Sequence, residues 1–195
     1  MLVMEFAKFG SLESFLRELT SGHSKFIPFL KFTQDIASGM EFLEKKQIVH
    51  RDLASRNILM TTLDTLKIAD FGLSQSLAPG ETVYIVKTER TIPFLWYAPE
   101  SIKANPIFTH KSDVWSFGVT LWEIFMLGSQ PNYPVTDVQN LIDLLKTGKR
   151  LTLPDKKVPY TLECWPIIRN CWHLDPLNRP NFNEIRKKLE LINLI

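Results

Sequence analysis

The sequence predicts an α+β fold that is mostly helical and carries one short β-hairpin. Apolar residues recur at the three- and four-residue spacing of amphipathic helices along most of the chain. Two short apolar runs flank a polar turn, which is typical of a hairpin. Residues 114–127 are apolar on nearly every side, and a helix of that kind must be buried all round, so we expect it to be the axis of the fold. A chain of 195 residues, 45% of them hydrophobic, can bury such a core.

The first part of the chain predicts a strand end, a connector and two helices. Residues 2–4 resemble the tail of a strand, and residues 5–10 a short connector. Ser11 is expected to cap a helix with an amphipathic surface pattern. A longer helix begins near Pro28, because proline suits a first helical turn, and its apolar stripe delivers the chain to Val49.

The middle of the chain predicts a hairpin followed by a long loop. The apolar runs 58–60 and 66–69 are joined by a polar turn. Residues 73–92 are polar and irregular, with a turn at residues 79–80. A loop of this length is usually functional.

The later segments predict four more helices. Ser112 is expected to cap the buried axial helix, and Thr136 to begin the capping box of the next one. A further helix spans residues 162–172, where Pro166 is tolerable only near the first turn. Asn181 is expected to cap the last helix.

Composition limits the partners and the setting. The formal net charge is only +2 and no basic run is present, so nothing indicates a nucleic acid. No apolar stretch reaches twenty residues, and residues 1–6 lack the basic leader of a signal peptide, so we expect no membrane segment in this chain. Cys164 and Cys171 lie seven residues apart in one predicted helix, a separation of roughly 10 Å that is too long for a disulfide. Two unbridged thiols favour a reducing, cytoplasmic setting.

Two motifs follow one another at a characteristic distance. Residues 50–57 read H-R-D-L-A-S-R-N after the long helix, and residues 70–72 read D-F-G after the hairpin. This layout resembles the catalytic loop and metal site of the protein kinases. Phosphoryl transfer from ATP to a hydroxyl requires an enzyme to orient the hydroxyl, hold magnesium and neutralise charge. The resemblance therefore implies a protein-kinase-like fold, mostly a helical C-terminal lobe, with ATP and Mg²⁺ as cofactors.

The resemblance also assigns roles inside these motifs. It implies that Asp52 orients the substrate hydroxyl and that Asn57 and Asp70 bind magnesium. Arg56 is the cation of the catalytic loop. His50 could act as a general base, but in kinases this histidine packs in the core and orients the loop, and the base is Asp52.

The start of the chain resembles the passage between the two kinase lobes. By this resemblance Met4 is the gatekeeper behind the adenine, Glu5 and Ala7 present backbone groups to the adenine edge, and Leu59 lies beneath the ring. The alternative for this segment is a plain edge strand. The implied organisation is an end of the small lobe and hinge at residues 1–10 and a kinase C-terminal lobe at residues 11–195.

Further residues resemble kinase landmarks with structural roles. Residues 93–100 resemble the substrate platform and A-P-E motif, and Glu100 is expected to pair with Arg179. Asp113 is expected to hold the backbone of the catalytic loop; the alternative is a first-turn acid favoured by the helix dipole, and both can hold. The structural residues implied in this way are His50, Phe71, Gly72, Glu100, Asp113 and Arg179.

Other positions resemble the tyrosine kinases, and specifically their receptor type. Serine/threonine kinases usually have a lysine where Ala54 stands, whereas tyrosine kinases have a cation at the position of Arg56. Pro93 and Trp96 match a P-x-x-W platform for the longer tyrosine side chain. The resemblance implies transfer of the γ-phosphate to tyrosine in protein substrates. It also implies a parent receptor dimer at the cytoplasmic face of the plasma membrane, if the parent is a receptor.

Four loop positions bear on regulation and specificity. Tyr84 lies within the segment that resembles an activation loop, and Arg51 beside the catalytic aspartate offers a cation to a phosphate on that tyrosine. The alternative is an inert exposed tyrosine. Leu95 and Gln75 depart from the family pattern, since kinases of this type often carry basic residues there.

The chain contains no G-x-G-x-x-G loop and no V-A-I-K-like lysine before the hinge segment. It therefore resembles the large lobe with the small lobe largely missing. Two functions stay open: a receptor-like tyrosine kinase, or a catalytically inactive kinase-lobe fragment or pseudokinase that acts as a binding module. The intact Asp52, Asn57 and Asp70 favour the first, and the missing motifs favour the second for this chain taken alone.

Overall fold

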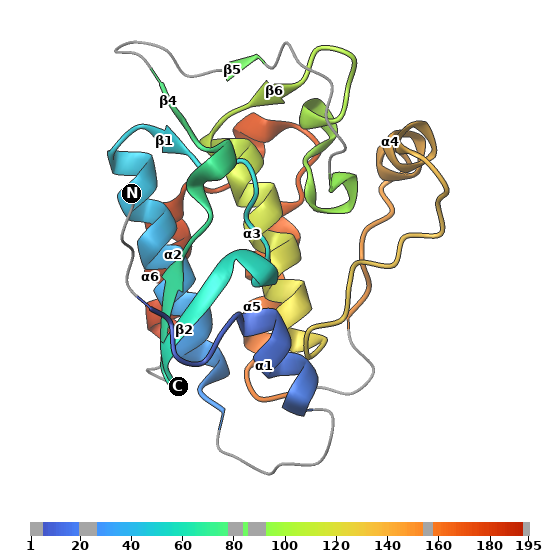
Figure 1. The fold of residues 1–195 in the computed structure, drawn as a ribbon. Helices are drawn as coiled ribbons and strands as arrows, with labels where there is room; N and C mark the ends of the chain where they lie inside the picture. The colour runs from blue at the N-terminus through green and yellow to red at the C-terminus, as the bar shows by residue number, and fades with distance from the viewer. Residues whose placement is uncertain (1–5, 20–26, 78–83, 86–92, 154–157, 193–195) are drawn as a thin grey trace.

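The computed structural model describes residues 6–19, 27–77, 84–85, 93–153 and 158–192 (Figure 1). In this part of the chain the α-helices are α1 (Leu12–Leu19), α2 (Phe29–Lys45), α3 (His110–Phe125), α4 (Val138–Lys146), α5 (Thr161–Cys171) and α6 (Phe182–Ile192). The predicted mostly helical α+β fold is confirmed. The strand end at 2–4 and the turn at 79–80 lie outside the described residues.

The described strands form short antiparallel pairs. The predicted hairpin is confirmed as β2 (Ile58–Thr62) with β3 (Thr65–Ile68). Two further pairs join distant segments: β1 (Ile48–Val49) with β4 (Gln75–Ser76), and β5 (Tyr84–Ile85) with β6 (Ile107–Phe108).

These pairs correct one expectation, because the segment 73–92 is not irregular throughout. It contributes β4 and β5, each only two residues long. Strands this short show no alternation of apolar and polar residues, and they form because partners distant in sequence lie beside them. The result is that this segment is paired to β1 near the catalytic loop and to β6 just before α3.

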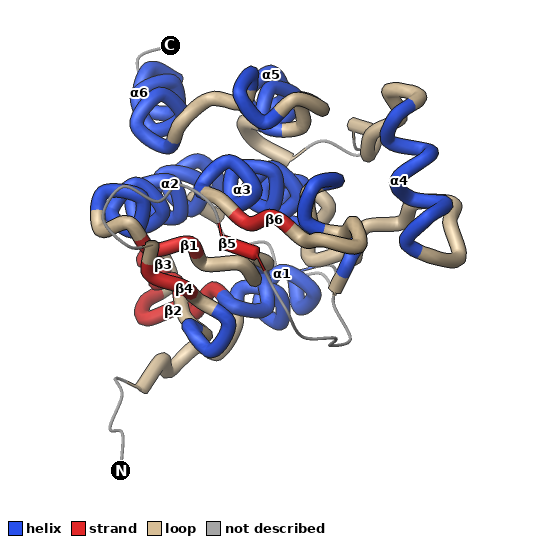
Figure 2. The backbone as a smooth tube through the Cα atoms, turned by 90° about the horizontal axis from the view of Figure 1, so that it is seen from above, coloured by secondary structure: helices blue, strands red, loops and turns tan. Residues whose placement is uncertain are grey.

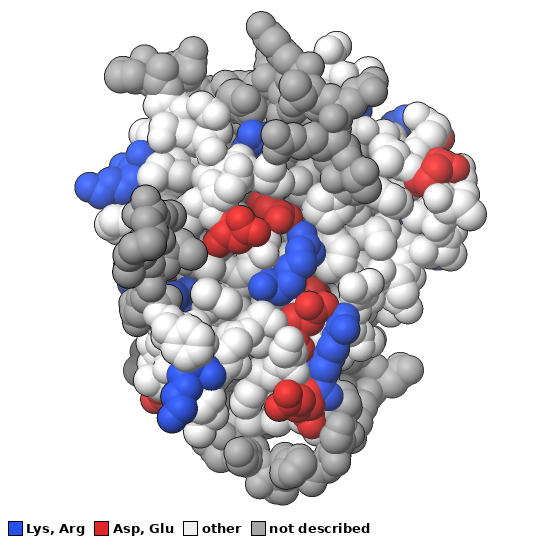
Figure 3. Space-filling view, viewed as in Figure 1, with Lys and Arg blue, Asp and Glu red and all other residues white. Residues whose placement is uncertain are grey.

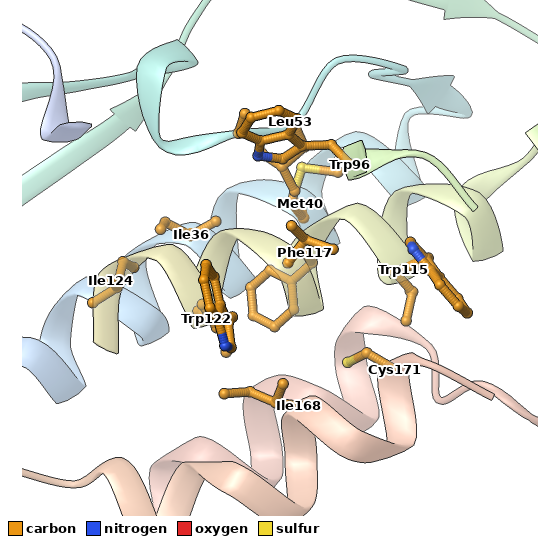
Figure 4. Packing of buried hydrophobic residues seen from close by; sticks show 14 of the residues in the cluster. Ile36, Met40, Leu53, Trp96, Trp115, Phe117, Trp122, Ile124, Ile168 and Cys171 are labelled. Atoms are coloured by element: carbon orange, nitrogen blue, oxygen red, sulfur yellow. The ribbon is translucent and has the colours of Figure 1, made fainter. Parts of the chain in front are cut away.

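The elements form layers around α3 (Figure 2). Helices α2 and α3 make the middle layer, α5 and α6 cover one side, and the strands and α1 lie on the other. Fourteen of the sixteen residues of α3 are buried, so the prediction of an axial helix is confirmed. Figure 4 shows its side chains between Ile168 of α5 on one side and Met40 of α2 on the other, where Leu53 and Trp96 of the loops also lie.

Two helix starts and one proline inside a helix differ from the sequence predictions. Thr109, not Ser112, is the N-cap of α3. Ser112 is the third residue of the helix, and its Oγ accepts a hydrogen bond from Thr109 N at 2.9 Å. Either hydroxyl can cap, but only the earlier one satisfies the first N–H groups of a helix that starts at residue 110. Asp137, not Thr136, caps α4. Pro166 is the sixth residue of α5, beyond the first turn, and packing of α5 on α3 maintains the helix across it.

The helix caps expected at Ser11 and Asn181 are confirmed. Ser11 Oγ accepts from Ser14 N at 3.2 Å at the start of α1, and Asn181 Oδ1 accepts from Glu184 N at 2.8 Å at the start of α6. Cys164 and Cys171 are both free and buried, and burial raises the pKa of each thiol to about 12. Among the described helices, none is long and apolar enough to cross a membrane.

Gly118 permits the close approach of α3 to the end of α5. A Cβ at this position would lie 2.7 Å from Trp172 Nε1 and 2.9 Å from Cys171 Cβ. We expect Gly118→Ala to lower the free energy of unfolding, because overpacking costs about 1–3 kcal/mol, whereas alanine contributes only about 1 kcal/mol of helix propensity. Urea denaturation would measure the change. The exposed Ser38→Ala on α2 is the control, and equal stability of the two variants would contradict this account of the contact.

Candidate active site

The backbone of the catalytic loop is held by one buried carboxylate. Asp113, near the start of α3, accepts His50 N at Oδ2 (2.8 Å) and Arg51 N at Oδ1 (2.9 Å). Arg51 has a φ of 71°, a conformation that residues other than glycine seldom adopt, and the bond to its N–H stabilises it there. Burial raises the pKa of Asp113 to about 7, while the two backbone N–H groups act in the opposite direction.

His50 connects the catalytic loop to the end of β3. Its Nδ1 accepts Asp52 N at 3.3 Å, so the proton is on Nε2, which donates to the carbonyl oxygen of Ala69 at 3.1 Å. The ring is fully buried and meets Phe71 edge to face at 5.3 Å. Burial lowers the pKa of the imidazole, which favours the neutral form. A buried neutral ring with both nitrogens bonded orients the loop and has no nitrogen left for a substrate.

Asp52 is held by two side chains from the next turn of the loop. The 3₁₀ turn Ser55–Asn57 brings Arg56 Nη2 to 2.5 Å from Asp52 Oδ1 and Asn57 Nδ2 to 2.8 Å from Oδ2. Asn57 Nδ2 also donates to the backbone oxygen of Asp52 at 2.7 Å. Asp52 remains partly accessible. Figure 3 shows acidic and basic side chains alternating down the middle of one face of the molecule. The three residues assigned to catalysis therefore form one cluster.

Asp70 follows β3 in a left-handed conformation, with a φ of 59°. Its Oδ1 accepts Gly72 N at 3.2 Å, and its side chain is exposed. The N–H of Ala69 donates to the carbonyl oxygen of Asn57 at 2.9 Å, which ties the end of β3 to the catalytic loop. Because Asn57 uses its amide nitrogen for Asp52, its Oδ1 is the atom left for a metal. An amide oxygen and a carboxylate are the hard ligands that Mg²⁺ prefers, so both residues fit the ion.

The adenine side of the site is described only in part. Met4 and Glu5 lie outside the described residues, whereas Ala7 O accepts Gly10 N at 3.3 Å in a turn. That turn runs along β2, since Phe9 N donates to Met60 O at 3.3 Å. Leu59, in the same strand, is half-buried. The segment assigned to the hinge and the residue assigned beneath the adenine thus lie next to each other.

The expected partner of Glu100 is in contact with it. Arg179 donates to both carboxylate oxygens, at 2.6 and 2.9 Å, and also to the carbonyl oxygens of His173 and Lys111. The guanidinium lies 5.0 Å from the centre of the Trp115 ring. Arg179 is 2% exposed, so this pair joins the end of the activation segment to the last third of the chain inside the core.

The two residues assigned to regulation converge on β6. The backbone of Tyr84 pairs with Phe108, and the guanidinium of Arg51 lies 4.6 Å from the centre of the Phe108 ring. The side chain of Tyr84 lies outside the description.

Sequence reasoning missed Glu123 and the role of Ser55. Glu123 is 1% exposed in the middle of α3, and its carboxylate accepts hydrogen bonds from Ser55 and from the indole of Trp96. The guanidinium of Arg56 lies over the same indole, 4.7 Å from the ring centre. The sequence contains a signal for this role, because an acidic residue inside an otherwise buried helix must have hydrogen-bond partners.

Comparison with known sequences agrees with this geometry. The family model described as protein tyrosine and serine/threonine kinase matches residues 1–189. The chain belongs to this kinase family. The family membership predicted from the motifs is therefore confirmed, and kinases of this family generally use ATP and Mg²⁺.

Two curated kinase relatives cover almost the whole chain. Fibroblast growth factor receptor 1 of Pleurodeles waltl is 38% identical over 98% of this chain, and the tyrosine-protein kinase Shark of Drosophila melanogaster is 42% identical over 93%. The likeness to tyrosine kinases that Ala54 and Arg56 predict is confirmed by these relatives. This chain spans only 24% of the length of the fibroblast growth factor receptor 1 and 19% of the length of Shark.

Proposed function

We propose that the protein is a receptor-like tyrosine kinase that transfers the γ-phosphate of ATP to tyrosine in protein substrates. The observation that carries the proposal is the Asp52 carboxylate, held between Arg56 and Asn57 beside the Trp96 platform. In this proposal residues 1–10 are the end of the small lobe and the hinge, and residues 11–195 are the C-terminal lobe.

The residues of the site divide the work of the reaction. Magnesium-ATP, when bound, supplies the phosphoryl group and neutralises the charge on its oxygens. In this proposal Asn57 Oδ1 and the Asp70 carboxylate would hold the metal, and Leu59 and the backbone of Glu5 and Ala7 would hold the adenine. Asp52 orients the tyrosine hydroxyl and accepts its proton. The oxygen that loses the proton forms a bond to the γ-phosphorus, while the bond from that phosphorus to the β,γ-bridging oxygen breaks and ADP leaves.

Arg56 supports tyrosine as the acceptor. The residue two positions after Asp52 is Ala54, which is fully buried, so no cation approaches the transferring phosphate from that position. Arg56 instead reaches Asp52 from the same side as the Trp96 indole. The partners would then be tyrosine-containing proteins and, if the parent is a receptor, a second receptor at the cytoplasmic face of the plasma membrane.

We also propose that Tyr84 is a regulatory phosphorylation site with Arg51 as its cationic partner. The pairing of β5 with β6 supports this, because the Tyr84 backbone lies opposite Phe108, on whose ring Arg51 stacks. A phosphate on the tyrosine adds close to two negative charges and three acceptor oxygens, which favours a neighbouring arginine.

The second candidate function is a binding module without catalysis. The absence of a Gly-rich loop and pairing lysine from these 195 residues favours it. So does an apolar groove of about 520 Å³ between α2 and β3, where the Phe71 side chain is 49% exposed.

A direct test joins the small lobe of the related fibroblast growth factor receptor 1 to the front of this chain. We expect this chimera to transfer radiolabelled phosphate from magnesium-ATP to a tyrosine-containing copolymer, because all large-lobe groups for the reaction are present. The chain alone should not, since it has no cover over the phosphates. An inactive chimera that still binds magnesium-ATP would favour the binding module. Phosphate transfer by the chain alone would contradict the expectation that catalysis needs the small lobe.

A further inference from the structure

One buried carboxylate on α3 joins the catalytic loop to the substrate platform. Glu123 Oε2 accepts Ser55 N at 3.0 Å and Trp96 Nε1 at 2.9 Å, and Oε1 accepts Ser55 Oγ at 2.7 Å. Ser55 is fully buried and Trp96 nearly so. A buried carboxylate is stable only when it is well bonded, and here all three donors come from the two segments that would meet a substrate.

The contact continues from Trp96 to Asp52. The Trp96 ring lies under the guanidinium of Arg56 at 4.7 Å, and that guanidinium donates to Asp52 Oδ1 at 2.5 Å. Any rotation of the indole therefore moves the surface on which Arg56 rests. Since Glu123 fixes the indole N–H, it determines that surface.

The side chain of Ser55 adds a second bond to this arrangement. An alanine at this position would keep the backbone N–H but would lack the hydroxyl donor to Oε1. In this protein the same residue binds the carboxylate through both its N–H and its side chain. The loop and the carboxylate are consequently joined at two points.

We propose that Glu123, together with the Ser55 hydroxyl, is a positioning residue that holds the Trp96 platform in register with Asp52. It does not touch the substrate and acts through Trp96 and Arg56. The proposal rests on the proposed function, because register with Asp52 matters only if Asp52 receives the hydroxyl.

The first arm of the test reads the contact without any activity. In the ¹⁵N-labelled chain, the indole N–H of Trp96 is identified by its loss in Trp96→Phe. Glu123→Gln keeps an acceptor oxygen but removes its charge, and hydrogen bonds to charged groups are about twice as strong as neutral ones. We therefore expect this variant to speed solvent exchange of the Trp96 proton by about 5–10-fold. Ser55→Ala should give a smaller change in the same direction.

The matched control is Thr120→Val, one turn away on the same helix. Thr120 is equally buried, but its hydroxyl donates to Ser116 O within α3 and reaches neither segment. We expect it to lower stability while leaving the Trp96 proton unchanged. Equal changes in Thr120→Val and Glu123→Gln would overturn the proposal, because the effect would then be general loosening of the helix.

The second arm is kinetic and uses the chimera described above. We expect Glu123→Gln to lower kcat for the copolymer by about 10²-fold, since small misplacements of reacting groups have effects of that size. KM for ATP should change much less than kcat, because Glu123 bonds to Ser55 and Trp96 and to no residue assigned to the metal or the adenine. An unchanged kcat would overturn the positioning role. If the unmodified chimera transfers no phosphate, the proposed function fails, and a Trp96 exchange rate that Glu123→Gln leaves unaltered would separately refute the contact.

Discussion

Asp52→Asn in the chimera should lower turnover by about 10²–10⁴-fold, the usual contribution of a general base. The amide keeps the shape of the carboxylate but cannot accept the proton of the tyrosine hydroxyl. Binding of magnesium-ATP should be nearly unchanged, because Asp52 bonds to Arg56 and Asn57 and is not assigned to the metal. Steady-state transfer to the copolymer and calorimetric titration with magnesium-ATP measure the two quantities.

Asp70→Asn provides the comparison for this experiment. The Asp70 carboxylate is exposed and bonded only weakly to Gly72 N, at 3.2 Å. The main effect of the substitution should therefore be the loss of a charged metal ligand. We expect this variant to weaken magnesium-ATP binding as well as the rate. The same loss of nucleotide affinity in both variants would contradict the division of roles between Asp52 and Asp70.

Arg179→Ala should have the largest effect on stability, a loss of about 3–5 kcal/mol, because removal of one partner leaves the other charge buried and unpaired. Glu100 would lose two charge-assisted bonds, and the carbonyl oxygens of His173 and Lys111 would lose their donors. Urea denaturation of the chain measures this loss. Arg169→Ala, on the exposed side of α5, is the matched arginine control and should change stability little.

A double variant tests the cause of that loss. Glu100→Gln added to Arg179→Ala removes the unpaired carboxylate, so part of the lost stability should return. If Arg179→Ala and Arg169→Ala lower the free energy of unfolding equally, the pair of Glu100 and Arg179 contributes nothing to stability in solution.

Patterns with a local physical cause could be predicted from the sequence. The helical stripes and the hairpin follow from the spacing of apolar residues, and the caps at Ser11 and Asn181 follow from side chains that bond the nearest N–H groups. The family could be predicted because the catalytic loop and the D-F-G triplet carry their own spacing. The placement of the residues assigned to hinge, metal and regulation remains a prediction about function.

The features that sequence reasoning missed depend on contacts distant in the chain. The strands β4 and β5 exist because β1 and β6 lie beside them. The helix α5 continues across Pro166 because it packs on α3. From the sequence, Glu123 only interrupts an apolar segment. Its partners Ser55 and Trp96 lie 68 and 27 residues away, and no local pattern indicates that they contact it.

The two N–H bonds that Asp113 accepts have a consequence for how the kinase could be switched. They hold residues 50 and 51 from inside the helical core, and the bonds among Asp52, Arg56 and Asn57 are local to the same turn. The catalytic loop is thus preorganised, and little conformational entropy remains to be lost when a substrate arrives. Asp113 and the local bonds therefore keep Asp52 in place, so any change of conformation that leaves these bonds intact must occur in the segments around the loop.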